Sequence, residues 1–319
     1  MAKFRDATDD TTVLPAGTSA ALSHDDAAAA PVEPDPAVHD RSIGDILAEL
    51  RHLSADQVAK VLAHQREKGV RFGEAAVALG LASKDDVIFA LAQQFHYPYA
   101  PEEQRKLQGD LVALNEPFSA RAESFRALRS QLMMRLFSDA DGMGGPGRAL
   151  AVISPDTGDG KTYTATNLAV TLAQLGGRTL LVDADMRSPR VHEVFQLGNQ
   201  AGLSSILSGR ADKQVIQQVA AIPSLFVLPV GTTPPNPQEL VERPAFGMLL
   251  RELVAKFDHV VVDTPAAVHG ADAAVIAAKC GAALVLARKN VSRSAALREL
   301  VASLAGAPVK LAGVVFNEF

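Results

Sequence analysis

The strongest constraint on the fold of this chain is an alternation that begins near Arg148. Short apolar runs rich in β-branched residues follow one another, separated by stretches in which apolar residues recur at helical spacing. Continuous apolar runs of this kind are typical of parallel strands covered by helices on both faces. The pattern predicts an α/β domain over residues 148–319 with a mainly parallel sheet. The expected strands are ALAVIS, TLLVDAD, LFVLPV, HVVVDTP, AALVLAR and LAGVVFN.

The first of these strands runs into a loop suited to binding phosphate. SPDTGDGKT follows it and leads into a helical pattern, which is the strand, loop and helix order that a phosphate loop requires. Glycines permit the tight turn, and the amides of a helix N-terminus attract anions. The pattern GxxxxGK[ST] is incomplete because Pro155 takes the first glycine position. The residues expected to bind ATP here are Thr157, Gly158, Asp159, Gly160, Lys161, Thr162 and Tyr163.

Two further predicted strands end in acidic residues. Asp183 and Asp185 lie in LLVDADMR, and Asp263 lies in VVVDTP. Because the carboxyl ends of parallel strands meet at one edge of a sheet, we expect these side chains to face the phosphate loop. A single aspartate at the end of a strand is equally consistent with a helix cap and with a metal ligand. Two such sites beside a phosphate loop favour Mg²⁺, which prefers oxygen ligands.

These motifs resemble those of the MinD/ParA-like P-loop ATPases and, within that group, the bacterial tyrosine kinases of exopolysaccharide export. Over about residues 119–319, SPDTGDGKT resembles Walker A, LLVDADMRSP Walker A′ and HVVVDTPA Walker B. VGTTPPNPQELV and GVVFN resemble two further family segments, the second of which implies that Asn317 lies near the nucleotide base. Positioning ATPases carry an additional lysine five residues before the conserved one. This chain has Asp156 there, which favours the kinase branch.

The resemblance implies ATP and Mg²⁺ as cofactors and a role for each motif residue. Asp183 or Asp185 would orient or deprotonate the acceptor hydroxyl. Arg187 would stabilise transition-state charge or, alternatively, form a surface ion pair with Glu193. The implied catalytic residues are Lys161, Asp183, Asp185 and Arg187. The implied metal ligands are Thr162, Asp183 and Asp263.

A helix is predicted over residues 119–137, where ESFRALR carries the spacing ExxRxxR. In the kinase family this helix docks against the neighbouring subunit of a ring, which implies a homo-oligomer held through Glu123, Arg126 and Arg129. The alternative is a salt bridge within the helix, which would be worth little. We assign residues 100–147 to a linker and this oligomerisation helix.

An internal repeat with an offset of 29 residues lies between residues 41 and 99. Each copy has two helical patterns, the second capped by a serine. RFGEAAVALGLASKDDVIFALAQQ resembles the N-terminal domain of type II secretion and MshE-type ATPases, some of which bind cyclic di-GMP. The alternative is a helical protein-docking module. The cyclic di-GMP candidates are Ile43, Gly44, Leu62, Gln65, Arg71, Gly73, Gly80, Leu81, Leu91 and Gln94.

Charge and composition limit which cell compartment and which classes of partner we expect. Residues 1–40 hold two basic and eight acidic side chains, which predicts a disordered acidic arm. The net charge of the whole chain is -5, so the remainder is close to neutral and no nucleic-acid partner is expected. One cysteine, Cys280, and a start without an apolar leader predict a cytoplasmic protein. No membrane span is expected, so attachment to the inner membrane requires a partner.

The overall expectation is an ATP-dependent tyrosine kinase that regulates exopolysaccharide chain length with a transmembrane co-polymerase. The C-terminal tyrosine cluster of that family is missing, since the tyrosines are Tyr97, Tyr99 and Tyr163. The acceptor therefore lies on another protein, or Tyr97 and Tyr99 replace the cluster, or the domain is an ATPase switch. Two alternatives stay open: a MinD/ParA-like switch without kinase activity, and a cyclic di-GMP sensor whose P-loop domain is a platform.

Overall fold

The computed structural model describes residues 42–94, 99, 110–137, 149–210 and 215–318. The predicted acidic arm, Tyr97 and much of the 100–147 linker lie outside the described residues.

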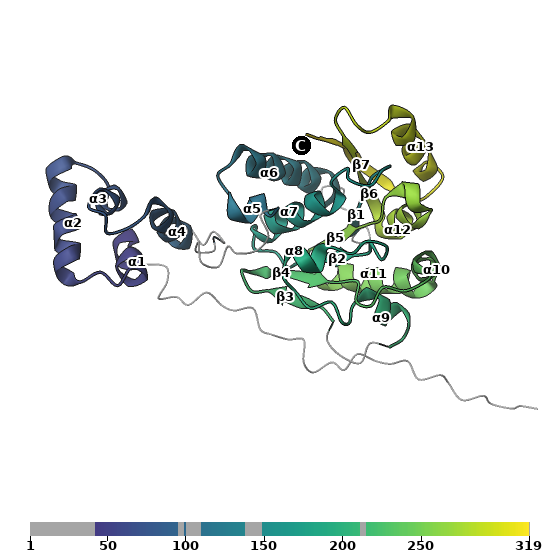
Figure 1. Ribbon diagram of the computed structural model, residues 1–319, viewed down its shortest axis with the longest axis horizontal. Helices are drawn as coiled ribbons and strands as arrows, with labels where there is room; N and C mark the ends of the chain where they lie inside the picture. Colours follow the sequence, from purple (N-terminus) through teal and green to yellow (C-terminus); the bar gives the residue numbers. More distant parts are fainter. Residues whose placement is uncertain (1–41, 95–98, 100–109, 138–148, 211–214, 319) are drawn as a thin grey trace, which may run out of the picture. The chain divides into compact units, whose positions relative to one another are not determined.

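The described strands form a seven-stranded sheet with the order β3-β4-β2-β5-β1-β6-β7 (Figure 1). β3 pairs antiparallel with β4, and the other pairs are parallel, so the predicted α/β class with a mainly parallel sheet is confirmed. β3 was not predicted, because its sequence QQV lacks an apolar run. The strands are β1 (Ala149–Ile153), β2 (Thr179–Asp183), β3 (Gln217–Val219), β4 (Ile222–Leu228), β5 (His259–Asp263), β6 (Gly281–Arg288) and β7 (Lys310–Asn317).

Helices cover both faces of the sheet, as the apolar runs predicted. Alternate residues of β1 point to opposite faces, so Leu150 and Val152 join one core cluster and Ala151 and Ile153 the other. The first cluster includes α5 (Val112–Asn115), α6 (Ala120–Leu132), α7 (Lys161–Ala173) and α8 (Val191–Val194). The second includes α9 (Leu203–Leu207), α10 (Pro237–Glu242), α11 (Pro244–Lys256), α12 (Asp272–Cys280) and α13 (Ser294–Leu304).

The helix predicted over residues 119–137 is present in two parts. The Ser119 side chain accepts a hydrogen bond from the amide of Ala122 and caps α6. After Leu132 the chain continues as a π-helix, η2 (Met133–Phe137). Arg135 in this turn donates to the carbonyl of Ala312 at 3.2 Å, which ties the turn to the edge strand β7.

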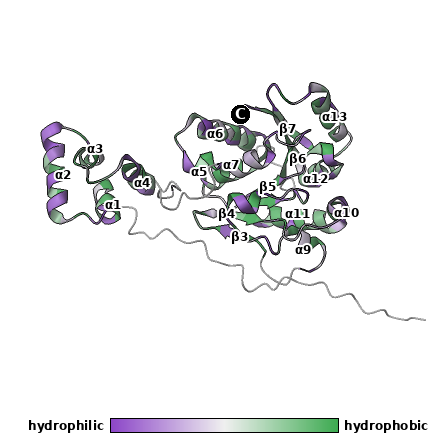
Figure 2. Cartoon of the chain, viewed as in Figure 1, coloured by the Kyte–Doolittle hydropathy of each residue, from purple (hydrophilic) through white to green (hydrophobic). Residues whose placement is uncertain are grey.

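The N-terminal helical module, residues 42–94, repeats its helix starts at the predicted offset. Its helices are α1 (Ile43–Leu50), α2 (Ala55–Lys68), α3 (Phe72–Ala78) and α4 (Lys84–Gln94). α1 packs on α4 and α2 on α3. The buried cluster between α2 and α3 is small and consists of Val61, Ala75 and Ala76. Figure 2 shows α2 mostly in the hydrophilic colour, whereas β4 and β5 of the sheet are largely hydrophobic.

The two copies of the repeat differ where the first one has Arg51 and the second has Gly80. Gly80 adopts φ +67°, a left-handed conformation that favours glycine. Arg51 instead donates from Nε to the Asp86 carboxylate at 2.7 Å. Burial by itself would raise the pKa of Asp86, but this contact and the bonds from Ser83 lower it. The departure in the first copy therefore serves an ion pair inside the module.

Candidate functional site

The phosphate loop connects β1 to α7 at the carboxyl edge of the sheet. Gly158 and Gly160 have φ values of +85° and +95°, which a residue with a Cβ adopts only with strain. α7 begins at Lys161, and most of its residues are buried in the core on one face of the sheet. This places the amides at the helix N-terminus where they attract phosphate oxygens.

Lys161 and Thr162 link the loop to the neighbouring strands. Lys161 is 7% exposed and donates from Nζ to the hydroxyl of Ser154 at 3.1 Å. Thr162 donates from Oγ1 to the Asp263 carboxylate at 2.6 Å. Burial lowers the pKa of Lys161, and the carboxylates of Asp263 and Asp185 oppose that shift. The predicted nucleotide lysine is thus a largely desolvated cation among carboxylates.

Asp183 and Asp263 end adjacent strands and are both fully buried. Burial raises the pKa of Asp263 to about 7, with the Thr162 hydroxyl and Lys161 opposing the shift. Burial also raises the pKa of Asp183 well above its usual range, and the charge of Asp263 adds to this. For both carboxyl groups the loss of water therefore outweighs the interactions that favour the charged form, including that of Lys161 with Asp263.

The two aspartates differ in what their oxygens already bind. The carboxylate of Asp183 accepts hydrogen bonds from the amides of Asp185 and Val191, each at 3.1 Å. Val191 begins α8, so Asp183 also stabilises the start of that short helix. Asp185 in turn accepts from the amides of Arg187 and Ser188 at 3.1 and 2.9 Å. Asp263 meets the Thr162 hydroxyl, which makes this pair the better placed one for a metal.

The residues present fit Mg²⁺ of the kind that shares its shell with phosphate. Among the residues that the structure describes, no group of three or more His, Cys, Asp or Glu side chains could hold a metal ion by itself. Mg²⁺ usually takes one or two carboxylates and completes its shell with substrate phosphates and water. Thr162 and Asp263 offer a hydroxyl and a buried carboxylate side by side, which suits that arrangement.

Arg187 does not make the surface ion pair that the sequence suggested as an alternative. Its guanidinium lies 2.9 Å from the carboxylate of Asp272, which is 2% exposed at the start of α12. Glu193 lies instead 3.9 Å from Arg190. The alternative pairing was wrong because each residue has another partner, Asp272 for Arg187 and Arg190 for Glu193. Asp272 was missed, although an acidic residue in the first helical turn is a common cap signal.

Asp159 connects the phosphate loop to residues at the carboxyl ends of β6 and β7. Its buried side chain accepts from the amide of Asp156 at 2.9 Å and from the hydroxyl of Ser292 at 2.6 Å. Asn317 donates from its side chain to the carbonyl of Asp159 at 3.2 Å. The ends of β6 and β7 therefore help to hold the loop. Ser292 was not foreseen, and no local sequence pattern marks it.

The segment after β5 runs beside the phosphate loop. The amides of Ala267 and Val268 donate to the carbonyls of Ser154 and Pro155, both at 3.0 Å. One residue further on, Nε2 of His269 lies 2.8 Å from the hydroxyl of Thr157. His269 belongs to η3 (Ala267–His269) and was not among the expected site residues.

On α6, the predicted oligomerisation residues make contacts within the chain. Arg126 pairs with Glu123 at 2.7 Å, which is the intrahelical bridge given as the alternative. Arg129 donates to the carbonyl of Thr171 at 2.8 Å and so fastens α6 to α7. The rings of Phe125 and Tyr163 meet edge-on at 5.6 Å, and burial raises the pKa of Tyr163.

The cyclic di-GMP candidates are spread over all four helices of the module and their turns. Gly73 is buried, and a Cβ there would lie 2.6 Å from a methyl carbon of Val87. Helix packing therefore accounts for Gly73 without a ligand. Ile43, Gly44, Gln65 and Leu81 are half-buried, and the exposed candidates are Leu62, Arg71, Gly80, Leu91 and Gln94.

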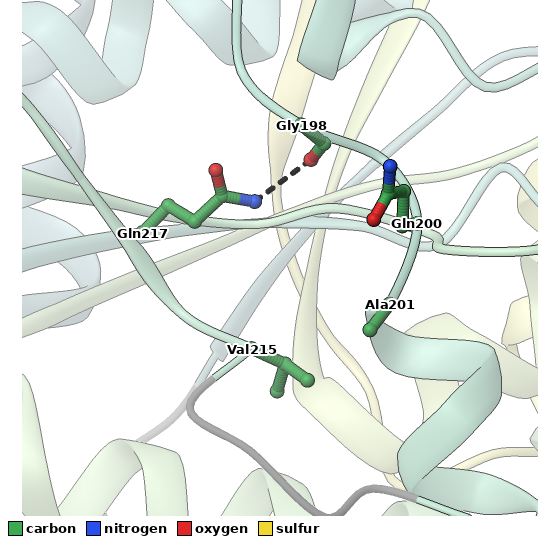
Figure 3. A pocket seen from close by; sticks show the side chains of 5 residues that line it. All are labelled: Gly198, Gln200, Ala201, Val215 and Gln217. Carbon is green, nitrogen blue, oxygen red and sulfur yellow. Dashed lines mark hydrogen bonds between the residues drawn. The ribbon is translucent and has the colours of Figure 1, made fainter.

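A hollow elsewhere on the domain lies between the 198–201 segment and the start of β3 (Figure 3). Gln217 donates across it to the carbonyl of Gly198 at 2.8 Å. The lining residues are Gly198, Gln200, Ala201, Val215 and Gln217, and none of them is a predicted site residue. This hollow therefore has no part in the predicted site.

The helices that the structure describes include none with the length and apolar character needed to cross a bilayer.

Known proteins match the nucleotide-binding domain of this chain. The sequence model of the CobQ/CobB/MinD/ParA nucleotide binding domain matches residues 150–319. The tyrosine-protein kinase YwqD of Bacillus subtilis is 34% identical over 213 residues, which cover 66% of this chain and 87% of YwqD. The tyrosine-protein kinase ptk of Acinetobacter johnsonii is 30% identical over 215 residues, but this chain spans only 28% of its length.

Among solved structures, the kinase domain of the Escherichia coli tyrosine kinase ETK is similar with a TM-score of 0.60 and 30% identity. The match covers 65% of this chain and 79% of the ETK chain. A resemblance of the N-terminal module to the MshE-type domain is supported by none of these matches.

Proposed function

Because this chain belongs to the CobQ/CobB/MinD/ParA nucleotide-binding domain family and is similar to bacterial tyrosine-protein kinases, we propose that it is an ATP-dependent protein-tyrosine kinase. The observation that carries the proposal is the meeting of Lys161, Thr162 and Asp263 at the start of α7. A buried lysine, a hydroxyl and a buried carboxylate are the groups that phosphoryl transfer from Mg·ATP requires.

In this proposal, the amides around Gly158 and Gly160 hold the phosphates and Lys161 neutralises their charge. Thr162 and Asp263, with Asp183, would hold Mg²⁺, which supplies further charge neutralisation when bound. Catalysis then rests on positioning and electrostatics, because phosphoryl transfer asks for little covalent chemistry from the protein.

The acceptor side of the reaction is assigned to Asp185 and Arg187. Asp185, or Asp183 beside it, would orient or deprotonate the tyrosine hydroxyl. Arg187 would stabilise charge on the transferred group, with Asp272 holding its guanidinium in place at 2.9 Å. The family resemblance of GVVFN implies that Asn317 lies near the base, and its side-chain amide donates to the carbonyl of Asp159 in the loop.

Labelled ATP tests the activity directly. Purified protein is incubated with γ-labelled ATP and Mg²⁺, alone and with the cytoplasmic part of a candidate membrane partner. Lys161→Met is the blank, since it keeps the bulk of the side chain and removes the cation. We expect label on tyrosine with the unchanged protein and none with the blank. Released phosphate without labelled protein would instead favour an ATPase switch of the MinD/ParA type.

We also propose that the kinase works as a homo-oligomeric ring with α6 at the subunit contact. Arg126 and Glu123 are the better candidates for that contact, because Arg129 is engaged with α7 in its own chain. Light scattering across nucleotide states tests the ring. A monomer in every state would rule it out.

The proposed setting is exopolysaccharide assembly, where the kinase regulates chain length together with a transmembrane co-polymerase. In this setting the protein is cytoplasmic and peripheral to the inner membrane through that partner. The similarity to the named kinases supports the enzyme class, while the partner and the polymer are what the family resemblance of the Walker motifs and ExxRxxR implies.

For the N-terminal module we propose cyclic di-GMP binding, which rests on the repeat and on the exposed Arg71. The competing function is docking to another protein. Calorimetric titration of cyclic di-GMP into the unchanged protein and Arg71→Ala distinguishes them. Binding that Arg71→Ala weakens supports the nucleotide, and no binding by the unchanged protein removes it.

A further inference from the structure

The position of His269 is set by the backbone around it. The amides of Ala267 and Val268 bond to consecutive carbonyls of the phosphate loop, at Ser154 and Pro155. These two bonds hold the segment beside the loop, and the side chain of His269 then reaches the hydroxyl of Thr157 at 2.8 Å. The backbone hydrogen bonds of the two preceding residues therefore help to position the imidazole beside the loop.

Thr157 is at the rim of the phosphate cradle. It directly precedes Gly158, whose left-handed backbone turns the loop toward the N-terminus of α7. The side chains of Thr157 and His269 are both exposed, so a ligand in the cradle can reach the imidazole. Lys161 is 7% exposed and therefore approaches the cradle from the buried side.

The same segment lies close to Arg187. Gly270 has φ +146°, and a Cβ built there would lie 3.4 Å from Nη2 of Arg187 and 3.0 Å from the Asp272 carboxylate. His269 thus belongs to a short stretch that contacts the phosphate loop on one side and the Arg187–Asp272 ion pair on the other. This stretch links the two sets of groups assigned to phosphoryl transfer.

We propose that His269 contacts the terminal phosphate of bound ATP and so favours a nucleoside triphosphate over a diphosphate. In this structure its Nε2 lies within hydrogen-bond distance of the Thr157 hydroxyl, at 2.8 Å. When a triphosphate binds, the imidazole exchanges this neutral partner for a phosphate oxygen, which gives a stronger, charge-assisted hydrogen bond. The amides of the loop contact the inner phosphates of ATP and ADP alike, whereas His269 meets only the outermost group. The inference rests on the proposed function, because it requires ATP in this loop.

Calorimetry with two nucleotides tests the assignment without measuring catalysis. The Mg²⁺ complexes of ADP and of a non-hydrolysable ATP analogue are titrated into the unchanged protein, His269→Ala and His269→Gln. We expect His269→Ala to weaken the ATP analogue about tenfold and to leave ADP within about twofold. His269→Gln, which retains an N–H donor, should recover part of the loss. Val268→Ala is the control, because the Val268 side chain is exposed and only its backbone contacts the loop.

The outcomes separate this inference from the proposed function. Equal weakening of both nucleotides by His269→Ala would mean that His269 only shapes the loop, and an unchanged ATP affinity would mean that it makes no phosphate contact. Either result overturns the inference while the proposed function stands. Failure of the unchanged protein to bind either nucleotide would overturn both.

Discussion

The nucleotide-binding domain and the N-terminal helical module differ in how they treat the residues that their motifs share with known families. In the domain, Lys161, Asp183 and Asp263 are 7%, 0% and 0% exposed, although each carries an ionisable group. In the module, the charged candidate Arg71 is exposed and the buried candidate is Gly73, a residue without a side chain.

Helix packing explains the motif glycine of the module, whereas it does not explain the buried charged residues of the domain. Burying ionisable groups costs free energy unless they are paired or bind an ion, so the carboxylates of the domain point to a cationic ligand. A buried glycine against Val87 improves helix packing and points to no ligand. Mutations in the two regions should therefore affect different properties.

The largest effect is expected for Asp263→Asn. If Asp263 binds Mg²⁺, phosphoryl transfer should fall by at least about 100-fold. The nucleotide-free protein should nevertheless become more stable at pH 8, because the substitution removes a buried charge. Labelled-ATP transfer measures the first effect and urea unfolding the second. Loss of activity together with loss of stability would contradict this account, since it would make Asp263 a structural residue like Gly73.

The pH dependence of stability follows from the same carboxyl group. Burial raises the pKa of Asp263 from 3.8 to about 7. Between these values the unfolded chain has lost the proton and the folded protein keeps it, so stability falls as pH rises from about 4 to about 7. We expect this loss to amount to a few kcal/mol and Asp263→Asn to reduce it.

In the module, Gly73→Ala and Gly44→Ala form a matched pair because they occupy equivalent positions of the repeat. A Cβ at Gly73 would lie 2.6 Å from Val87, so we expect a destabilisation of about 1–3 kcal/mol. At Gly44 the nearest atoms lie 3.5 Å away, and alanine there should be neutral or stabilising by up to about 1 kcal/mol. Thermal unfolding measures both. Similar effects at the two sites would show that overpacking is not the cause.

On α6, Arg129→Ala and Arg126→Ala should separate stability from assembly. Arg129→Ala removes the bond to the Thr171 carbonyl and should cost about 1 kcal/mol. Arg126→Ala removes an ion pair whose Glu123 partner is 69% exposed, so the stability should change little. Chemical unfolding is compared with particle mass by light scattering. The proposed ring would be weakened by Arg126→Ala, and an unchanged oligomer would remove α6 from the contact.

The smallest effect is expected for Arg51→Ala in the module. The pair with Asp86 is partly exposed, with 47% of the Arg51 side chain in contact with solvent. Its loss should cost about 0.5–1 kcal/mol, and less at high salt because exposed charges are screened. Unfolding at low and high salt measures it. A much larger cost would mean that this ion pair, rather than the small apolar cluster, holds the module together.

Much of the domain could be predicted from local patterns. Continuous apolar runs marked the parallel strands, and the glycines before Lys161 marked the phosphate loop, because both depend on residues close together in sequence. The strand β3 could not be predicted. Its three residues are an edge hairpin partner of β4, and such a strand is stabilised by its neighbour rather than by its own composition.

The repeat offset and the capping serines likewise predicted the helices of the module, since caps and helical periodicity act within a few residues. The role of Gly73 could not be read in this way, because Val87 approaches from another helix. His269 and Ser292 were missed for the same reason: their partners Thr157 and Asp159 lie more than one hundred residues earlier.

The sequence by itself therefore determined the fold class and the strand ends at which charged groups gather, because parallel strands bring their carboxyl ends to one edge. The tertiary structure alone decided which groups meet there. Thr162 contacts Asp263 across 101 residues and Arg187 contacts Asp272 across 85 residues. Such pairs depend on how helices pack against the sheet, and helix packing is a property of the assembled core rather than of any local spacing.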